Sequence, residues 1–194
     1  MIHLLRRLIR ESIGRPKIYV LVGPPGVGKT YWVEQNVQDP YIISRDAVVD
    51  MVREPLGLKY DDMFGPKGRE ASKEVDRIHR ENVAGAVKSG KNIVVDMTNM
   101  SAKARQNALN AIKGKESEYE KIAVVFPFQG AENIIKKVNK KRAEEIKAKG
   151  GSKTVPDHAF DRMFATFQDV HPDEGFDQII TKDNRELLKQ LADY

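Results

Sequence analysis

The chain has 194 residues, of which 40% are hydrophobic and 31% are charged, and this balance predicts one globular domain. It contains no cysteine, which excludes a disulfide scaffold and thiolate metal sites and fits a reducing cytoplasm. No apolar run approaches the length of a membrane span, so we expect a soluble protein without a membrane partner.

The N-terminal segment, residues 1–16, has apolar residues at helical spacing with arginines between them. This pattern predicts an amphipathic helix ahead of a single domain that spans residues 17–194. The segment lacks the long apolar centre and the cleavage site of a secretory signal. We interpret it as a helix that packs on the domain surface, with contact to a membrane or to nucleic acid as the alternative.

Five short apolar runs predict strands, and helical patterns fill the gaps between them. The predicted strands are 17–22, 41–44, 92–95, 121–126 and 177–180, and the predicted helices are about 29–37, 46–54, 69–89, 102–113, 131–148, 157–168 and 184–192. Strands that alternate with helices predict an α/β fold, with a five-stranded, mostly parallel sheet covered on both faces. The glycine- and proline-rich stretch 55–68 predicts a mobile loop.

Residues 23–30 match the phosphate-loop pattern Gly-x-x-x-x-Gly-Lys-Ser/Thr at every fixed position, directly after an apolar strand. Such a loop surrounds phosphate oxygens with backbone N–H groups at a helix N-terminus, and it predicts a P-loop NTPase or kinase fold. In this pattern Lys29 reaches the β- and γ-phosphates of ATP, and the Thr30 hydroxyl binds Mg²⁺. The predicted nucleotide-binding residues are Gly23, Pro24, Pro25, Gly26, Val27, Gly28, Lys29, Thr30 and Tyr31.

Two aspartates follow predicted strands at the edge of the sheet where the phosphate loop lies. Asp46 can accept the proton of a hydroxyl that attacks the γ-phosphate, or it only stabilises the N-terminus of the next helix. Asp96 ends the third strand, where a carboxylate can bind Mg²⁺ or its water, although aspartate is also common in turns. The two residues are therefore candidates for the general base and for a metal ligand.

The segment 131–153 is strongly basic, with eight basic and three acidic residues and a local net charge of +5. It predicts a basic lid that faces an anionic partner. Arg142 in this lid can neutralise charge on the transferred phosphoryl group, for which its planar fork is better suited than a lysine. The alternative is a solvated helix face with ion pairs between residues four apart.

These motifs together resemble the kinase domain of bacteriophage polynucleotide kinase over about residues 17–170. The resemblance rests on four stretches: the phosphate loop with Thr30-Tyr31-Trp32, then Ile43-Ser44-Arg45-Asp46, then Val94-Val95-Asp96-Met97-Thr98-Asn99, and the basic segment that ends in Thr154-Val155-Pro156.

The resemblance implies transfer of the γ-phosphate of ATP, with Mg²⁺, to the 5′-hydroxyl of DNA or RNA, as in nucleic acid repair. It implies Asp46 as general base, Lys29 on the transferred phosphoryl group, a lid arginine such as Arg142 on the ATP phosphates, and Thr30 near the metal. For a phage-encoded enzyme it implies the host cytoplasm as the location.

The chain departs from that family's pattern at two positions. The family has an acceptor-binding arginine three residues after the base, where this chain has Val49, with Arg45 and Arg53 as the nearest arginines. The family's third-strand aspartate directly precedes Thr-Asn, where this chain has Met97. Because adjacent strand residues face opposite ways, the resemblance does not carry a role over to Asp96.

The same stretch is also similar to the nucleotide-binding domain of heterogeneous nuclear ribonucleoprotein U, in its Asp-x-Thr-Asn step and in Val155-Pro156-Asp157-His158-Ala159. This second resemblance implies RNA binding and assembly. Three hypotheses follow from the sequence. The first is a polynucleotide 5′-hydroxyl kinase. The second is a small-molecule kinase with a nucleoside or sugar acceptor, and the third is a largely non-catalytic module that binds ATP and nucleic acid.

Overall fold

The computed structural model describes residues 14–148, 153, 155–184, 186 and 188–190. The N-terminal amphipathic helix predicted for residues 1–16 therefore lies almost entirely outside the described residues. Within the described part of the chain, no helix is both long enough and apolar enough to pass through a membrane.

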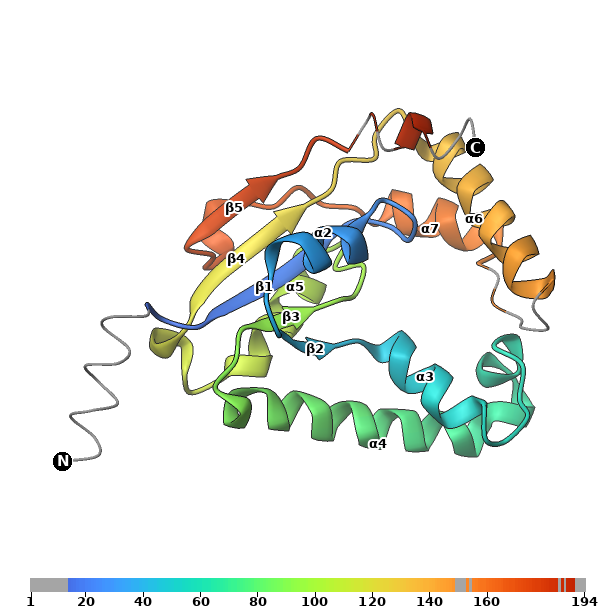
Figure 1. The fold of residues 1–194 in the computed structure, drawn as a ribbon, viewed down its shortest axis with the longest axis horizontal. Coiled ribbons are helices and arrows are strands. Elements are labelled where there is room, and N and C mark those ends of the chain that lie inside the picture. Colours follow the sequence, from blue (N-terminus) through green and yellow to red (C-terminus); the bar gives the residue numbers. More distant parts are fainter. Residues whose placement is uncertain (1–13, 149–152, 154, 185, 187, 191–194) are drawn as a thin grey trace.

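A five-stranded parallel sheet forms the centre of the molecule, with the strand order β2-β3-β1-β4-β5 (Figure 1). Each strand begins and ends within two residues of its predicted bounds. The strands are β1 (Lys17–Val22), β2 (Tyr41–Ile43), β3 (Ile93–Val95), β4 (Glu120–Val125) and β5 (Gln178–Thr181). Because β1 lies between β3 and β4 and is covered on both faces, it is apolar at almost every position.

Helices cover both faces of the sheet, as the alternation of strands and helices predicted. The helices are α2 (Lys29–Asn36), α3 (Arg45–Arg53), α4 (Arg69–Ala86), α5 (Ala102–Leu109), α6 (Glu132–Ala148) and α7 (Asp157–Ala165). Side chains of α2, α6 and α7 share one core cluster with Tyr19 and Leu21 of β1. Side chains of α4 and α5 share the opposite cluster with Ile18 and Val20. Of the helix predicted at 184–192, residues 186 and 188–190 are helical.

The stretch 55–68 was expected to be a mobile loop, but it contains two 3₁₀ helices, Asp61–Phe64 and Pro66–Gly68. The side chains of Tyr60 and Met63 are buried there against Val48, Val49 and Val52 of α3 and against α4. A Cβ on Gly68 would lie 2.4 Å from the carbonyl oxygen of Asp62, so the second 3₁₀ helix packs too closely for any other residue. We call α3, residues 55–68 and the start of α4 the α3 lobe; it has a small core of its own.

A buried arginine fastens the segment after α7 to the loop after β3. Arg105 is fully buried, and its guanidinium binds both carboxylate oxygens of Glu174 at 2.7 Å. It also donates to the carbonyl oxygens of Gln168, Asp169 and Asn99. This bidentate pair lowers the pKa of Glu174, and five hydrogen bonds satisfy the buried guanidinium.

We predict that Arg105→Met lowers the free energy of unfolding by about 3–5 kcal/mol, because it leaves the Glu174 carboxylate in a mostly buried position without its partner. Urea unfolding of the variant and the wild type measures this difference. The double variant Arg105→Met/Glu174→Met is expected to recover part of the loss, because it removes the unpaired charge. A double variant no more stable than Arg105→Met would contradict this explanation.

The same pair gives the stability a pH dependence of known sign. The pKa of Glu174 is lower in the folded protein than in the unfolded chain, so the stabilisation is present above the ordinary carboxyl pKa and is lost as the pH falls through the folded value. The difference between wild type and Arg105→Met is therefore expected to narrow at acidic pH.

Candidate active site

The phosphate loop has the backbone shape that its glycines predicted. Gly28 has a φ of 89° directly before α2, a left-handed conformation that side chains disfavour. Gly23 also has a positive φ, 153°, and a Cβ there would lie 3.1 Å from the side chains of both Phe126 and Val27, so close packing adds to the backbone preference for glycine. The first turn of α2 follows the loop, and Trp32 and Val33 anchor the helix in the core. The helix N-terminus is therefore fixed where the loop can bind an anion.

Lys29 folds back over the phosphate loop. Its Nζ donates hydrogen bonds to the carbonyl oxygens of Gly23 and Pro24, both at 2.8 Å. Burial lowers the pKa of Lys29 to about 8; the charges of Asp96 and Asp46 oppose this shift, and that of Arg142 adds to it. The four residues that sequence reasoning had selected separately therefore interact electrostatically with one another.

Asp96 follows the end of β3, on the side of the sheet where the phosphate helix packs. Val94 belongs to the core cluster of α2, whereas Val95 and Met97 belong to the opposite cluster. Asp96 thus continues the face of Val94, and Met97, at the position of the related family's aspartate, packs away from α2. Burial raises the pKa of Asp96, and Lys29 lowers it in part. The backbone joins both loops, because Gly23 N–H donates to the Thr98 carbonyl oxygen at 2.9 Å.

Asp46 lies in the first turn of α3, with its side chain 61% exposed. Ser44 caps this helix through a hydrogen bond from Ala47 N–H. Tyr60 Oη donates to Asp46 Oδ1 at 3.2 Å, and Lys153 Nζ lies 3.6 Å from Oδ2. Asp46 has the position of a helix-stabilising carboxylate and is also open toward the phosphate loop, so both sequence interpretations describe its surroundings.

The polar face of α3 carries residues that sequence reasoning did not select. Asp50 lies one turn after Asp46; its Oδ1 accepts from Arg53 at 2.7 Å, and its Oδ2 accepts from Lys153 at 3.1 Å. The spacing of four and then three residues places Asp46, Asp50 and Arg53 on one side of the helix, and this spacing was the available signal. Val49 belongs to the buried opposite side and is only 2% exposed, so it packs in the α3 lobe.

The two arginines nearest to Val49 are already engaged. Arg45 pairs with Asp76 of α4 at 2.8 Å, and Arg53 pairs with Asp50 and with Glu54. The sequence did not indicate Tyr60, and it indicated Lys153 only as part of the basic segment 131–153 and not as a neighbour of Asp46.

The basic lid packs against the phosphate loop through α6. The side chain of Val138 approaches Gly26, and Arg142 follows one helical turn later on the same side. Arg142 is exposed, and its charge contributes to the lowered pKa of Lys29. Lys140 pairs with Asp157 of α7 at 2.9 Å, and Lys136 pairs with Asp161. Both pairs link α6 to α7, and the side chain of Lys140 stays 63% exposed beside its partner.

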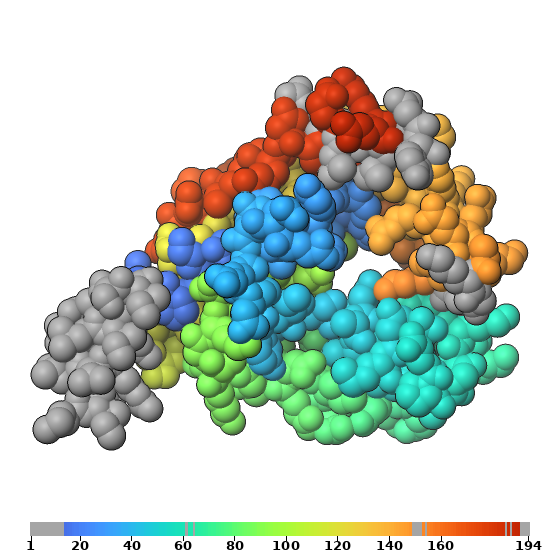
Figure 2. Space-filling model, in the orientation of Figure 1, coloured from blue at the N-terminus to red at the C-terminus, as the bar shows by residue number. Residues whose placement is uncertain are grey.

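An opening separates the three parts that contribute these residues. Figure 2 shows this opening, which is bordered by three parts: the phosphate loop together with α2, then α6, and then the α3 lobe. Lys29 and Arg142 are positive groups and Asp96 and Asp46 are negative ones, and the charges of the other three act on Lys29. The exposed Thr30 hydroxyl and the Asp96 carboxylate are hard oxygen donors that suit Mg²⁺. Among the described residues no group of three or more histidine, aspartate or glutamate side chains is arranged to hold a metal ion.

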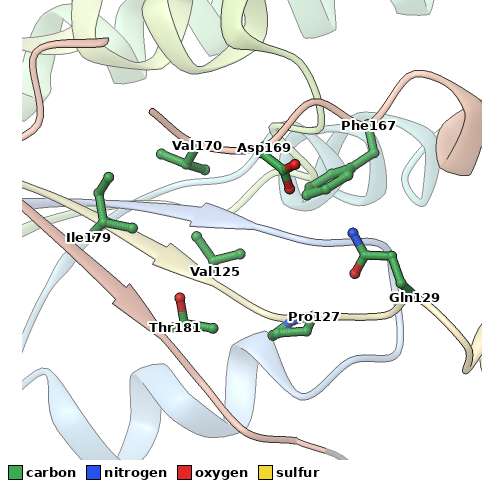
Figure 3. Close-up of a pocket in the computed structure, with 8 residues that line it drawn as sticks. All are labelled: Val125, Pro127, Gln129, Phe167, Asp169, Val170, Ile179 and Thr181. Carbon is green, nitrogen blue, oxygen red and sulfur yellow. The ribbon is translucent and has the colours of Figure 1, made fainter. Parts of the chain in front are cut away.

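A separate cavity of about 200 Å³ lies elsewhere, at the ends of β4 and β5 (Figure 3). Its walls include Val125, Ile179 and the Phe167–Val170 segment, which belong to the face of the sheet opposite to α2. Neither the phosphate loop nor α3 contributes to it. The cavity is therefore not part of the candidate active site.

A comparison with models of known protein families identifies the family of this chain. A family model described as an AAA domain matches residues 18–170, which include the phosphate loop, α3, the end of β3 and the lid. The chain belongs to the AAA domain family. Its five-stranded parallel sheet with helices on both faces is the α/β fold of P-loop proteins, in the kinase-like arrangement. A search among curated proteins finds no match.

Solved structures resemble this chain at low sequence identity. A candidate kinase from Chloroflexus aurantiacus has a TM-score of 0.56 at 12% identity, over 92% of this chain and 95% of that chain. A fungal RNA kinase has a TM-score of 0.49 at 13% identity, over 92% and 82%. The APS kinase of Mycobacterium tuberculosis has a TM-score of 0.40 at 16% identity, over 92% and 96%. At these identities the first likeness concerns the fold alone.

We predict that nucleotide binding weakens as the pH rises through about 8, the pKa of Lys29. Below this pH the ammonium is charged and attracts phosphate; above it the charge is lost, and affinity falls by up to about tenfold per pH unit. Calorimetric titration with Mg²⁺ and a non-hydrolysable ATP analogue between pH 7.5 and 9.5 measures the effect. Lys29→Arg stays charged over this range and is expected to give a flat profile. Parallel profiles for the two proteins would contradict the assignment.

Proposed function

We propose that this protein is a phosphotransferase that moves the γ-phosphate of ATP to the 5′-hydroxyl of a DNA or RNA strand. The observation that carries the proposal is the packing around the phosphate loop: Lys29 folds over it, the Thr98 carbonyl oxygen in the loop after Asp96 accepts from Gly23 N–H, and Val138 of α6 approaches Gly26. The charges of Asp96, Asp46 and Arg142, which come from three other elements, all act on Lys29. The exposed carboxylate of Asp46 on α3 adds a group that can accept the proton of an acceptor hydroxyl.

Each residue has a distinct role in the proposed reaction. The phosphate-loop N–H groups and Lys29 bind the β- and γ-phosphates, and Arg142 neutralises charge on the γ-phosphoryl group from the lid. Asp46 accepts the proton of the acceptor hydroxyl while the hydroxyl oxygen forms a bond to the γ-phosphorus. The bond from that phosphorus to the β–γ bridging oxygen breaks, and ADP leaves. Thr30 and Asp96 would hold Mg²⁺, which when bound offsets negative charge on the phosphate oxygens.

The charge of the lid and the residue at position 49 both bear on the nature of the acceptor. The exposed basic residues of α6 favour a nucleic acid strand, since phosphates of a strand can bind along the lid. The buried position of Val49 favours a small acceptor such as a nucleoside or sugar, because that residue offers no charge to a strand. A module that binds ATP and nucleic acid without transfer is the third possibility.

We predict that Lys29→Ala abolishes transfer and that Asp46→Asn lowers kcat by about 10²- to 10⁴-fold, the usual contribution of a general base. The assay follows label from γ-labelled ATP, with Mg²⁺, into 5′-hydroxyl DNA and RNA oligonucleotides, with 5′-phosphorylated strands as blanks. Both variants are expected to unfold at the wild-type temperature, because neither residue lies in a core cluster.

Asp39→Asn is the matched control for Asp46→Asn. Asp39 is exposed, pairs with Lys91 and precedes β2, at the opposite edge of the sheet from the phosphate loop. It is expected to keep full activity. Wild-type kcat in Asp46→Asn would remove the base assignment. Label in nucleosides or sugars but not in strands would favour the small-molecule kinase, and ATP binding without any label would favour the binding module.

We predict that the double variant Lys140→Gln/Lys141→Gln weakens oligonucleotide binding and reduces the slope of log K against log salt by roughly 1 to 2, because each lost phosphate contact releases fewer counterions. Fluorescence anisotropy at several salt concentrations measures the slope, with Lys91→Gln as the control for overall charge. If the slope is unchanged, these lid lysines do not bind the strand.

A further inference from the structure

The carboxylate of Asp46 is flanked by two residues to which the proposed reaction gives no role. Tyr60 Oη donates to its Oδ1 at 3.2 Å. The ammonium of Lys153 lies 3.6 Å from its Oδ2, which is longer than a hydrogen bond. Tyr60 comes from the α3 lobe, and Lys153 comes from the segment between α6 and α7. The two oxygens of Asp46 therefore have different surroundings: Oδ1 is engaged by a neutral donor, and Oδ2 has a cation nearby.

Tyr60 has a fixed position. Its ring is 8% exposed and packs in the α3 lobe with Val49 and Met63. Burial raises the pKa of the Tyr60 phenol above its usual value, and the neighbouring charge of Asp46 raises it further. The phenol thus keeps its proton over the working pH range and always offers a donor to Asp46. A rigid donor restricts rotation of the carboxylate that it binds.

The ring of Tyr60 also supports Lys153. The ammonium lies 5.1 Å from the ring centroid, within the range of a cation–π contact. Asp50 fixes the same ammonium, because its Oδ2 accepts from Lys153 while its Oδ1 accepts from Arg53. Tyr60 therefore touches Asp46 through its hydroxyl and Lys153 through its ring, which makes it the common contact of both.

We propose that Tyr60 is a positioning residue: it holds Oδ1 of Asp46 and supports Lys153, and this leaves Oδ2 as the oxygen that accepts the hydroxyl proton. The proposal rests on the proposed function, because it takes Asp46 as the base. Tyr60 touches neither ATP nor the acceptor hydroxyl in this account and acts only through Asp46. Its loss changes how often the carboxylate has the reactive orientation.

The test is Tyr60→Phe, which keeps the buried ring and the contact with Lys153 and removes only the hydroxyl. We expect kcat to fall by about 10- to 100-fold, while KM for ATP and for the acceptor stays within about twofold. The matched control is Tyr41→Phe, because the Tyr41 hydroxyl donates to the Asn82 carbonyl oxygen at 3.0 Å, away from the cleft. Tyr41→Phe is expected to keep the wild-type kcat.

A second comparison separates positioning from general damage. In an Asp46→Ala background Tyr60→Phe is expected to cause no further loss of the residual activity, because its partner is gone. The proposal is overturned if Tyr60→Phe behaves like Tyr41→Phe. It is also overturned if Tyr60→Phe lowers activity by the same factor with and without Asp46.

A stability measurement tests the contact independently of turnover. Urea unfolding of Tyr60→Phe, Asp46→Ala and the double variant forms a mutant cycle, and we expect the double variant to be less destabilised than the two single effects combined. Simple additivity would show that the hydroxyl does not hold Asp46 and would overturn the proposal. If the cycle shows coupling between Tyr60 and Asp46 but the wild type transfers phosphate to no acceptor, the proposed function and the base role of Asp46 are both refuted. The contact between the two side chains would still be established.

Discussion

The candidate site depends on the junction between the phosphate loop and the loop that follows β3. Gly23 N–H donates to the Thr98 carbonyl oxygen, and the buried Asn99 amide donates to the Leu21 carbonyl oxygen at 2.7 Å. Asn99 has a φ of 46°, a left-handed conformation that asparagine tolerates better than most residues. This turn brings Asp96 to the phosphate loop, and Arg105 holds it from behind through the Asn99 carbonyl oxygen.

In the candidate site, burial and neighbouring charges act in opposite directions on the pKa values of Lys29 and Asp96. Lys29 is buried enough that its pKa falls, yet two carboxylates nearby keep the ammonium form accessible. The same two effects act on Asp96 and shift its pKa in the other direction: burial favours the neutral form and raises the pKa, while Lys29 favours the charged form and lowers it. Groups poised in this way change charge readily when a ligand enters, and strongly shifted pKa values are typical of functional sites. The side chain of Asp46 is exposed, and Tyr60 and Lys153 lie beside its two oxygens.

Much of the fold follows from patterns that lie within short stretches. The apolar runs predicted all five strands, and the glycines with Lys29 and Thr30 predicted the phosphate loop, because both signals depend on neighbours in sequence. The helices of the α3 lobe were predicted, but the packing of 55–68 between them was not, because glycine and proline there favour a loop and conceal the buried Tyr60 and Met63. Arg105 gave no signal either, because an arginine is ordinarily exposed and its partner Glu174 is distant along the chain.

The site residues also divide into those that local sequence patterns indicate and those that only tertiary contacts bring together. Lys29, Asp46 and Asp96 follow strands whose ends must meet at one edge of a parallel sheet, so sequence reasoning selected them. Tyr60 and Lys153 reach Asp46 only through tertiary packing, and only the structure brings them there. Asp50 stands between these cases, since its helical spacing from Asp46 was visible but its contact with Lys153 was not.

The position of Lys29 has a further consequence for ligand recognition. Its ammonium is bound to two carbonyl oxygens of the loop that it serves, so the protein contains an internal competitor for any phosphate. The ammonium has one donor left for an entering nucleotide, and a phosphate that takes more must replace bonds to the loop, which lowers the net gain from each contact. Weakly charged ligands gain less from this exchange than phosphates do. The loop thereby discriminates by charge density, and it does so before any side chain outside the loop takes part.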